Sequence, residues 1–277
     1  MLKIKTEYEK VFPNIVNYTR DYLIKNKNLR SLIIGISGGI DSAVICALTS
    51  EVLKEIPNVK LIGRTIPIET NTEHEILRAK MIGENFCHHF EVKDLTSTYR
   101  DIYNNLVTDP ERMNNLSNEE KIRKGNIKAR TRMIYLFDLA HYNKGMVMST
   151  DNYTELLLGF WTLHGDVGNF GMIQYLWKTE VYGLAGYLVE KYKNENNNKK
   201  ADALKLCIDA VPTDGLGITT SDFDQIGVTE YETADMILID YLKGDEAKKN
   251  HPTIERHVKS EFKRVDPKNI PRKVLFK

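Results

Sequence analysis

The chain has 277 residues, of which 42% are hydrophobic and 28% are charged, a composition typical of a globular protein. Its 39 basic and 38 acidic residues leave a formal net charge of +1, so no overall field favours nucleic acid or a membrane surface. No apolar run approaches the ~18–20 residues of a membrane span, and the charged first residues lack the apolar core of a signal peptide. Three widely spaced cysteines, without a CxxC pair, are typical of reduced thiols. We therefore expect a cytoplasmic protein.

The first half of the chain alternates between helical and strand patterns. Apolar residues at helical spacing predict a helix over 8–23, in which Pro13 marks either a kink or a late start. Short, β-branched apolar runs predict strands over 31–37, 59–68 and 88–94. A helical pattern follows each of these strands, over 40–52, 72–86 and 95–107.

The second half continues this alternation. A long helix is predicted over 117–142, where Gly125 and Asn126 could bend it or divide it, and a short strand follows at 145–150. Further helices are predicted near 178–193, 200–209, 231–243 and 246–261. Strands that alternate with helices indicate an α/β fold, a doubly wound, mostly parallel sheet flanked by helices. Without a repeat or a linker, we expect one domain over 1–277.

The junction between the first strand and its helix is unusually rich in glycine. Residues 33–48 read IIGISGGIDSAVICAL, in which an apolar strand runs into Ser-Gly-Gly-Ile-Asp-Ser. Gly38 and Gly39 allow a tight turn that brings backbone N–H groups against an anion, and the helix N-terminus adds partial positive charge. Ser37 and Ser42 can add hydroxyl donors to the same oxygens. The junction therefore predicts a phosphate site.

An aspartate lies within this junction. Asp41 would repel a phosphate unless a divalent cation bridged the two groups. The motif therefore predicts a phosphate chain together with Mg²⁺. It is neither a Walker A loop, because it lacks the lysine, nor a G-x-G-x-x-G motif. It resembles the pyrophosphate-binding loop of the ATP pyrophosphatases, which cleave ATP to AMP and pyrophosphate.

Three further segments identify one member of that superfamily. They read KGNIKARTRMIYLFDLA (124–140), STDNYTELLLGFWTLHGD (149–166), and VPTDGL (211–216) followed by DQIGVT (224–229). In order and spacing they resemble the motifs of the ammonia-dependent NAD synthetases, over roughly residues 30–245. The resemblance implies an adenine nucleotide alpha hydrolase-like fold. It also implies that ammonia amidates the nicotinate carboxylate of deamido-NAD through an acyl-adenylate, giving NAD, AMP and pyrophosphate.

The resemblance also assigns roles to individual residues. It implies ATP contacts for Gly35, Ser37, Gly38, Gly39, Asp41, Ser42, Thr150, Lys178 and Thr213. Asp41 and Glu155 would hold Mg²⁺, and a lysine at position 178 would offset phosphate charge. Arg130, Asp166 and Lys263 would bind the pyridine nucleotide or ammonium, and Asp166 and Lys178 would take part in catalysis. A mobile cover is expected from 213–226, which is rich in Gly, Thr, Ser and Asp.

The chain departs from the family pattern on the pyridine-nucleotide side. Leu163 stands where a lysine is usual, Asn169 or Phe170 where an acidic residue is usual, and Phe262 where a histidine is usual. The acceptor is therefore left open between deamido-NAD and nicotinate mononucleotide, which would make the enzyme an NMN synthetase.

Other functions remain to be weighed against this resemblance, and the resemblance also implies partners. An inactive ATP-binding module is the alternative from another class, although the intact acidic residues and Lys178 argue against it. An RNA-modifying enzyme would need a basic RNA-binding domain, which the sequence lacks. Family members are homodimers, and the 117–142 helix is a candidate contact. Without an evident catalytic cysteine, glutamine use would need a separate glutaminase.

Overall fold

The structure, a computed structural model, describes residues 2–109, 111, 117–212, 223, 226–265 and 268–275. Its strands are β1 (Ser31–Gly35), β2 (Lys60–Thr65), β3 (His89–Val92), β4 (Gly145–Ser149) and β5 (Phe170–Gly171). The helices of the first half are α1 (Tyr8–Lys25), α2 (Ile40–Leu53), α3 (Glu73–Phe86), α4 (Thr96–Leu106) and α6 (Asn118–Tyr142). Those of the second half are α7 (Tyr153–Leu158), α8 (Lys178–Asn194), α9 (Asn198–Ile208), α11 (Tyr231–Leu242), α12 (Pro252–Lys259), a 3₁₀ turn η1 (Glu261–Arg264) and α13 (Arg272–Leu275).

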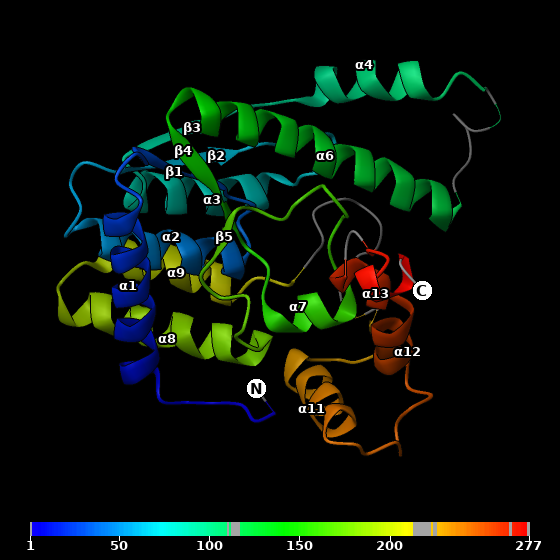
Figure 1. Cartoon of the computed structure of the whole chain (residues 1–277). Helices are drawn as coiled ribbons and strands as arrows, with labels where there is room; N and C mark the ends of the chain where they lie inside the picture. Colours follow the sequence, from blue (N-terminus) through cyan, green and yellow to red (C-terminus); the bar gives the residue numbers. More distant parts are fainter. Residues whose placement is uncertain are drawn as a thin grey trace.

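The described strands form one parallel sheet in the order β3-β2-β1-β4-β5 (Figure 1). From β1 the chain first steps outward through β2 to β3, and then returns to the other side of β1 for β4 and β5. The connections that follow β1 and β4 therefore leave in opposite directions. Such a switch point opens a crevice at the carboxyl ends of the strands, where α/β sheets bind ligands.

Helices cover both faces of this sheet. On one face α6 packs over β1 and β4, and its Met133 and Leu136 join Ile33, Ile62 and Val147 in one buried cluster. On the other face α2 lies against the sheet and is enclosed by α1, α3, α8 and α9 (Figure 1). Because α2 is buried on nearly every side, its sequence IDSAVICALTSEVL carries almost no polar face.

A third cluster lies beside the sheet rather than on it. Helices α7, α11 and α12 pack around the buried Trp177, which directly precedes α8. The ring of Tyr153, on α7, meets the Trp177 ring edge-on with centroids 4.8 Å apart. This cluster fixes the start of α8 against α7, and both of these helix starts carry residues of the candidate site.

The predicted fold class is confirmed, with local corrections. The helix over 117–142 continues unbroken through Gly125 and Asn126, and α1 begins at Tyr8 with Pro13 inside it. The helix predicted over 246–261 was wrong at its start, because α12 begins at Pro252. A proline is favoured in the first turn of a helix, where its missing N–H has no intrahelical acceptor. The short α7 and β5 were not predicted, and no described helix is long and apolar enough to cross a membrane.

Candidate active site

The Ser-Gly-Gly loop turns between β1 and α2 in a backbone conformation that requires glycine. Gly38 has φ +82°, and a Cβ added there would lie 2.4 Å from the backbone oxygen of Glu75 in α3. The Gly39 N–H donates to Ser37 Oγ at 3.2 Å, and Ser42 Oγ donates to the Gly39 carbonyl at 3.1 Å. Gly39 is the N-cap of α2 and offers no side-chain cap, so the first turn of this helix is open to an anion.

Next to the loop, one ammonium group joins two carboxylates. Lys178 Nζ lies 2.5 Å from Asp41 Oδ2 and 2.8 Å from Glu155 Oε1. The Asn152 side-chain amide holds Asp41 by donating to Oδ1 at 2.8 Å, while Asn152 and Glu155 form the capping box that starts α7. Three helix starts, those of α2, α7 and α8, therefore meet at this cluster.

Burial sets the electrostatics of this cluster. It raises the pKa of Glu155 above its ordinary value, and repulsion from Asp41 adds to the shift while Lys178 opposes it. Burial lowers the pKa of Lys178, but the attraction of Asp41 and Glu155 outweighs it and holds this pKa well above its ordinary value. The ammonium group therefore compensates two carboxylates that would otherwise repel each other.

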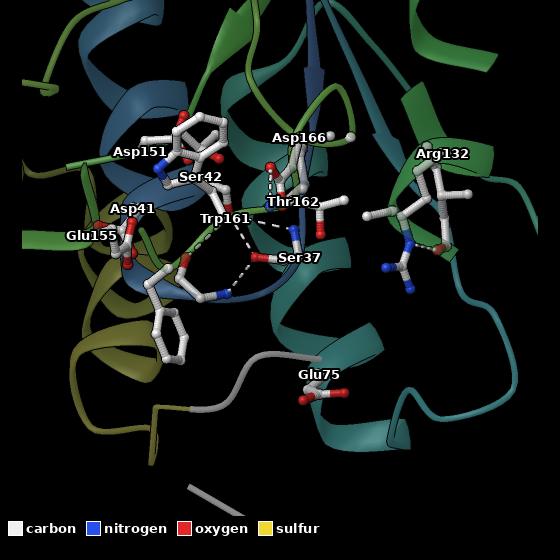
Figure 2. A pocket seen from close by; sticks show the side chains of 18 of the residues that line it. Ser37, Asp41, Ser42, Glu75, Arg132, Asp151, Glu155, Trp161, Thr162 and Asp166 are labelled. Atoms are coloured by element: carbon white, nitrogen blue, oxygen red, sulfur yellow. Dashed lines mark hydrogen bonds between the residues drawn. The ribbon is translucent and has the colours of Figure 1, made fainter. Parts of the chain in front are cut away.

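A second acidic group, Asp166, lines the same cavity as the loop. Asp166 accepts two hydrogen bonds from the Thr162 N–H, at 2.9 and 3.1 Å (Figure 2). Burial and the nearby Asp151 raise the pKa of Asp166 to about 7. Asp151 accepts from Ser149 Oγ at 2.7 Å, and burial raises its own pKa to about 6. Neutral and charged forms of Asp166 are therefore both accessible near pH 7.

One cavity of about 400 Å³ joins these groups. Ten residues named from the sequence line it: Gly35, Ser37, Gly39, Asp41, Ser42, Thr150, Glu155, Asp166, Lys178 and Lys263. Gly38 shapes the loop without lining the cavity. Lys263 Nζ donates to the carbonyls of Gly159 and Trp161, at 2.7 and 2.5 Å.

Other residues named from the sequence lie elsewhere. Arg130 is exposed and donates to the Leu163 carbonyl from Nε and Nη2, at 3.2 and 3.1 Å, outside the cavity lining. Thr213 lies outside the described residues, as does the expected cover 213–226 apart from Phe223 and Ile226.

Two of the positions that depart from the family pattern, Asn169 and Phe170, have structural contacts of their own. The Asn169 side chain accepts from the Val147 N–H at 3.1 Å, and the Phe170 ring packs on Tyr22 with centroids 4.7 Å apart. Phe262 is 63% exposed. None of these three side chains lines the described cavity.

The structure also brings in residues to which the sequence assigned no role. Arg132, Asp151 and Trp161 line the cavity, and Asn152 orients Asp41. The indole Nε1 of Trp161 is buried without a hydrogen-bond partner in the described part of the chain. Asp151 and Asn152 follow Thr150 directly, so their position after a parallel strand was a usable signal.

Comparisons with known proteins show the family to which the chain belongs. A protein-family model described as NAD synthase matches residues 11–269. The NH(3)-dependent NAD(+) synthetase of Thermoplasma acidophilum is 33% identical over 258 residues, which cover 90% of this chain and 94% of that protein. The corresponding protein of Chlorobium phaeobacteroides is 34% identical over 166 residues, 60% of this chain and 55% of that protein.

Similarity to solved structures supports the fold. A structure of NMN synthetase from Francisella tularensis superimposes with a TM-score of 0.77, covering 97% of this chain and 100% of that one, at 24% identity. Two findings establish the family. The family model matches most of the chain, and the Thermoplasma acidophilum protein is matched along nearly its whole length. The chain belongs to the NAD synthase family.

Proposed function

We propose that this enzyme uses ATP and ammonia to convert the nicotinate carboxylate of deamido-NAD into the amide of NAD, with AMP and pyrophosphate as the other products. One observation carries the proposal. A single cavity contains an anion-binding loop, a lysine with two carboxylates, and the partly buried Asp166. Those are the groups needed to activate a carboxylate with ATP and then deliver ammonia to it.

Activation is needed because a carboxylate is a poor target for an amine. Its charge repels nucleophiles and oxide is a poor leaving group, so the carboxylate oxygen first attacks the α-phosphorus of ATP. The loop from Ser37 to Ser42 receives the departing pyrophosphate through its backbone N–H groups and hydroxyls. Lys178 offsets the negative charge that develops on the pyrophosphate.

The paired carboxylates fit a magnesium ion. Asp41 and Glu155 supply hard oxygen ligands that converge on one point, where the Lys178 ammonium now lies between them. No described group of three or more His, Cys, Asp or Glu side chains could hold a metal alone. Two carboxylates are what a site needs when nucleotide phosphates and water supply the remaining ligands. When bound, Mg²⁺ would neutralise charge on the phosphates.

The ammonia step is assigned to Asp166. Ammonium dominates near neutral pH, so the site must attract this cation and take a proton from it before nitrogen attacks the acyl-adenylate. The ionised Asp166 attracts ammonium, and its pKa of about 7 lets it accept that proton. The ammonia nitrogen then attacks the acyl carbon and loses one further proton to solvent as the amide forms, and AMP leaves with the electron pair of the broken C–O bond.

Remaining roles are extensions of this proposal. Thr150 and Thr213 are assigned to ATP, and Arg130 and Lys263 to the acceptor. We also propose a homodimer in the cytoplasm, built on the outer face of α6, where Ile134 and Phe137 are 67% and 41% exposed. A separate glutaminase and the single domain over 1–277 stay predictions.

A product assay by mass spectrometry tests the function. The purified protein receives ATP, Mg²⁺ and ammonium, with deamido-NAD in one reaction and nicotinate mononucleotide in another. NAD and AMP in equal amounts from the first reaction alone is the expected result. Asp166→Asn should abolish product, whereas Lys193→Gln, at an exposed position of α8, should leave it unchanged.

The second reaction decides the acceptor. If only nicotinate mononucleotide gives an amide product, the proposed reaction holds but its acceptor is the mononucleotide and not deamido-NAD. Absence of AMP from both reactions, also with glutamine and a partner glutaminase, would refute the synthetase assignment and favour a nucleotide-binding module.

A further inference from the structure

Arg132 lines the cavity and has no role in the proposed chemistry. It projects from α6 toward the carboxyl end of β2 and lines the same cavity as the loop (Figure 2). Its Nε donates to the Ile66 carbonyl and its Nη2 to the Asn71 side chain, both at 2.9 Å. These two acceptors fix the plane of the guanidinium group. They are neutral, so they leave its charge uncompensated.

The charge of Arg132 is not paired within the described part of the chain. No described carboxylate lies within 4 Å of its guanidinium, and Nη1 has no described hydrogen-bond partner. Glu75 and Asp166 act on it only from a distance, and burial lowers the pKa of Arg132 to about 10. Arg132 is partly buried, and a partly buried charge without a counterion carries a desolvation cost, so an anionic ligand is expected to complete the pairing.

The position of Arg132 separates it from the pyrophosphate end of ATP. In Figure 2, Asp41 and Glu155 lie on one side of Ser37 and Ser42, and Arg132 lies on the other. The pyrophosphate half of ATP is already served by the loop and Lys178. The nucleotide's remaining anion is the α-phosphate, which Arg132 could reach as ATP runs from the loop toward the end of β2. The planar fork of arginine suits two phosphate oxygens at once.

We propose that Arg132 binds the α-phosphate of ATP and of the acyl-adenylate, and retains that phosphate in AMP. This inference rests on the proposed function, because it takes the loop as the pyrophosphate subsite. During activation, the α-phosphorus forms a bond to a carboxylate oxygen. Its bond to the bridging oxygen breaks, and that electron pair leaves with pyrophosphate. Arg132 therefore contacts the α-phosphate that stays with AMP, whereas Lys178 compensates the charge of the departing pyrophosphate.

Calorimetric titration of the whole protein with AMP, adenosine and Mg²⁺-pyrophosphate separates these subsites. Arg132→Gln should weaken AMP binding by about 10- to 100-fold, as expected for loss of a charged hydrogen bond. Binding of adenosine and of Mg²⁺-pyrophosphate should be unchanged, which also shows that the variant is folded. Arg132→Lys keeps the charge but not the planar guanidinium group, so its AMP affinity should lie between those of the wild type and Arg132→Gln. Lys121→Gln, an exposed change on the same helix, is the matched control.

Other outcomes would overturn the inference. An equal loss for all three ligands would make Arg132 a structural link between α6 and the segment after β2. A selective loss for pyrophosphate would place it in the leaving-group subsite, and an effect on deamido-NAD alone would assign it to the acceptor. If Arg132→Gln does not fold, Arg132→Lys carries the test, with an expected loss of about 3- to 10-fold for AMP alone.

The two proposals fail in distinguishable ways. Unchanged AMP binding in Arg132→Gln, with NAD still formed by the wild type, would refute the role of Arg132 only. Selective AMP loss in a protein that forms no NAD would refute the synthetase function and retain the phosphate contact.

Discussion

At the scale of single residues, the site depends on charges that are held away from water and compensated by one another. Lys178 is 4% exposed and contacts two carboxylates that are each 16% exposed. Removing one partner from a buried set of charges costs far more than removing an exposed ion pair, because the remaining charges keep their desolvation cost. The same lysine therefore stabilises the apo-protein and is poised to meet the nucleotide phosphates.

Lys178→Gln should lower the free energy of unfolding by about 3–5 kcal/mol, because Asp41 and Glu155 then repel each other without compensation. Urea unfolding without divalent cations measures this loss, and added Mg²⁺ should recover part of it. The activity should fall by at least about 100-fold. Lys193→Gln, whose side chain is 48% exposed, should change stability by less than about 0.5 kcal/mol. Equal effects of the two substitutions would contradict this account.

Asp166 gives stability a defined dependence on pH. Its pKa is about 7 in the folded chain, above its ordinary value of 3.8, so the folded state holds this proton more tightly than the unfolded state. This contribution to stability is complete below about pH 4 and is lost as the pH rises through about 7.

Asp166→Asn removes that titration. The unfolding free energy of the variant, minus that of the wild type, should therefore increase between pH 5 and pH 8. Urea unfolding at the two pH values measures the difference. A difference independent of pH would show that Asp166 does not titrate in this window.

At the scale of elements, the anion site is made by helix starts rather than by a flexible loop. The glycine turn at Gly38 packs directly on the first turn of α3, whose Arg78 Nε donates to the Gly38 carbonyl at 2.9 Å. The α2, α7 and α8 starts are then brought together at the end of the sheet. Each element contributes one or two groups, so their relative placement matters more than the length of any element.

Gly38→Ala should abolish or strongly weaken ATP binding. Alanine at φ +82° is strained, and its Cβ would lie 2.4 Å from a backbone oxygen that cannot move independently of α3. Gly186→Ala is the matched control, since nothing lies within 4 Å of the added Cβ inside helix α8. This control should stabilise the protein by about 0.5–1 kcal/mol. Thermal unfolding and ATP titration check both variants, and unaltered ATP binding in Gly38→Ala would be the contrary result.

At the scale of the whole molecule, the sequence predicted what depends on local pattern and on the rules of parallel sheets. The Ser37–Ser42 loop is contiguous, and the carboxyl ends of β1 and β4 meet at one edge, so Asp41 and Glu155 were expected to be close. The role of Arg132 could not be predicted in this way. Its position depends on how α6 packs on the segment after β2, which periodicity alone does not specify.

The same distinction explains the structural corrections. Asn169 and Phe170 sit where the family pattern suggests substrate contacts, yet they bond to β4 and pack on Tyr22 of α1. Residues before Pro252 have helical composition, but the described helix starts only where proline fits the first turn. Tertiary contacts therefore decided the roles of Asn169 and Phe170, whereas the start of α12 follows from a local signal, the proline at position 252.

The most direct test of the central claim follows oxygen from the acceptor carboxylate. Deamido-NAD with ¹⁸O at both oxygens of that carboxylate is converted with ATP, Mg²⁺ and ammonium, and the masses of the products are measured by mass spectrometry. Attack of the carboxylate on the α-phosphorus predicts one ¹⁸O in each AMP, one in each amide, and none in pyrophosphate. Label in pyrophosphate or inorganic phosphate, or AMP without label, would contradict activation as an acyl-adenylate.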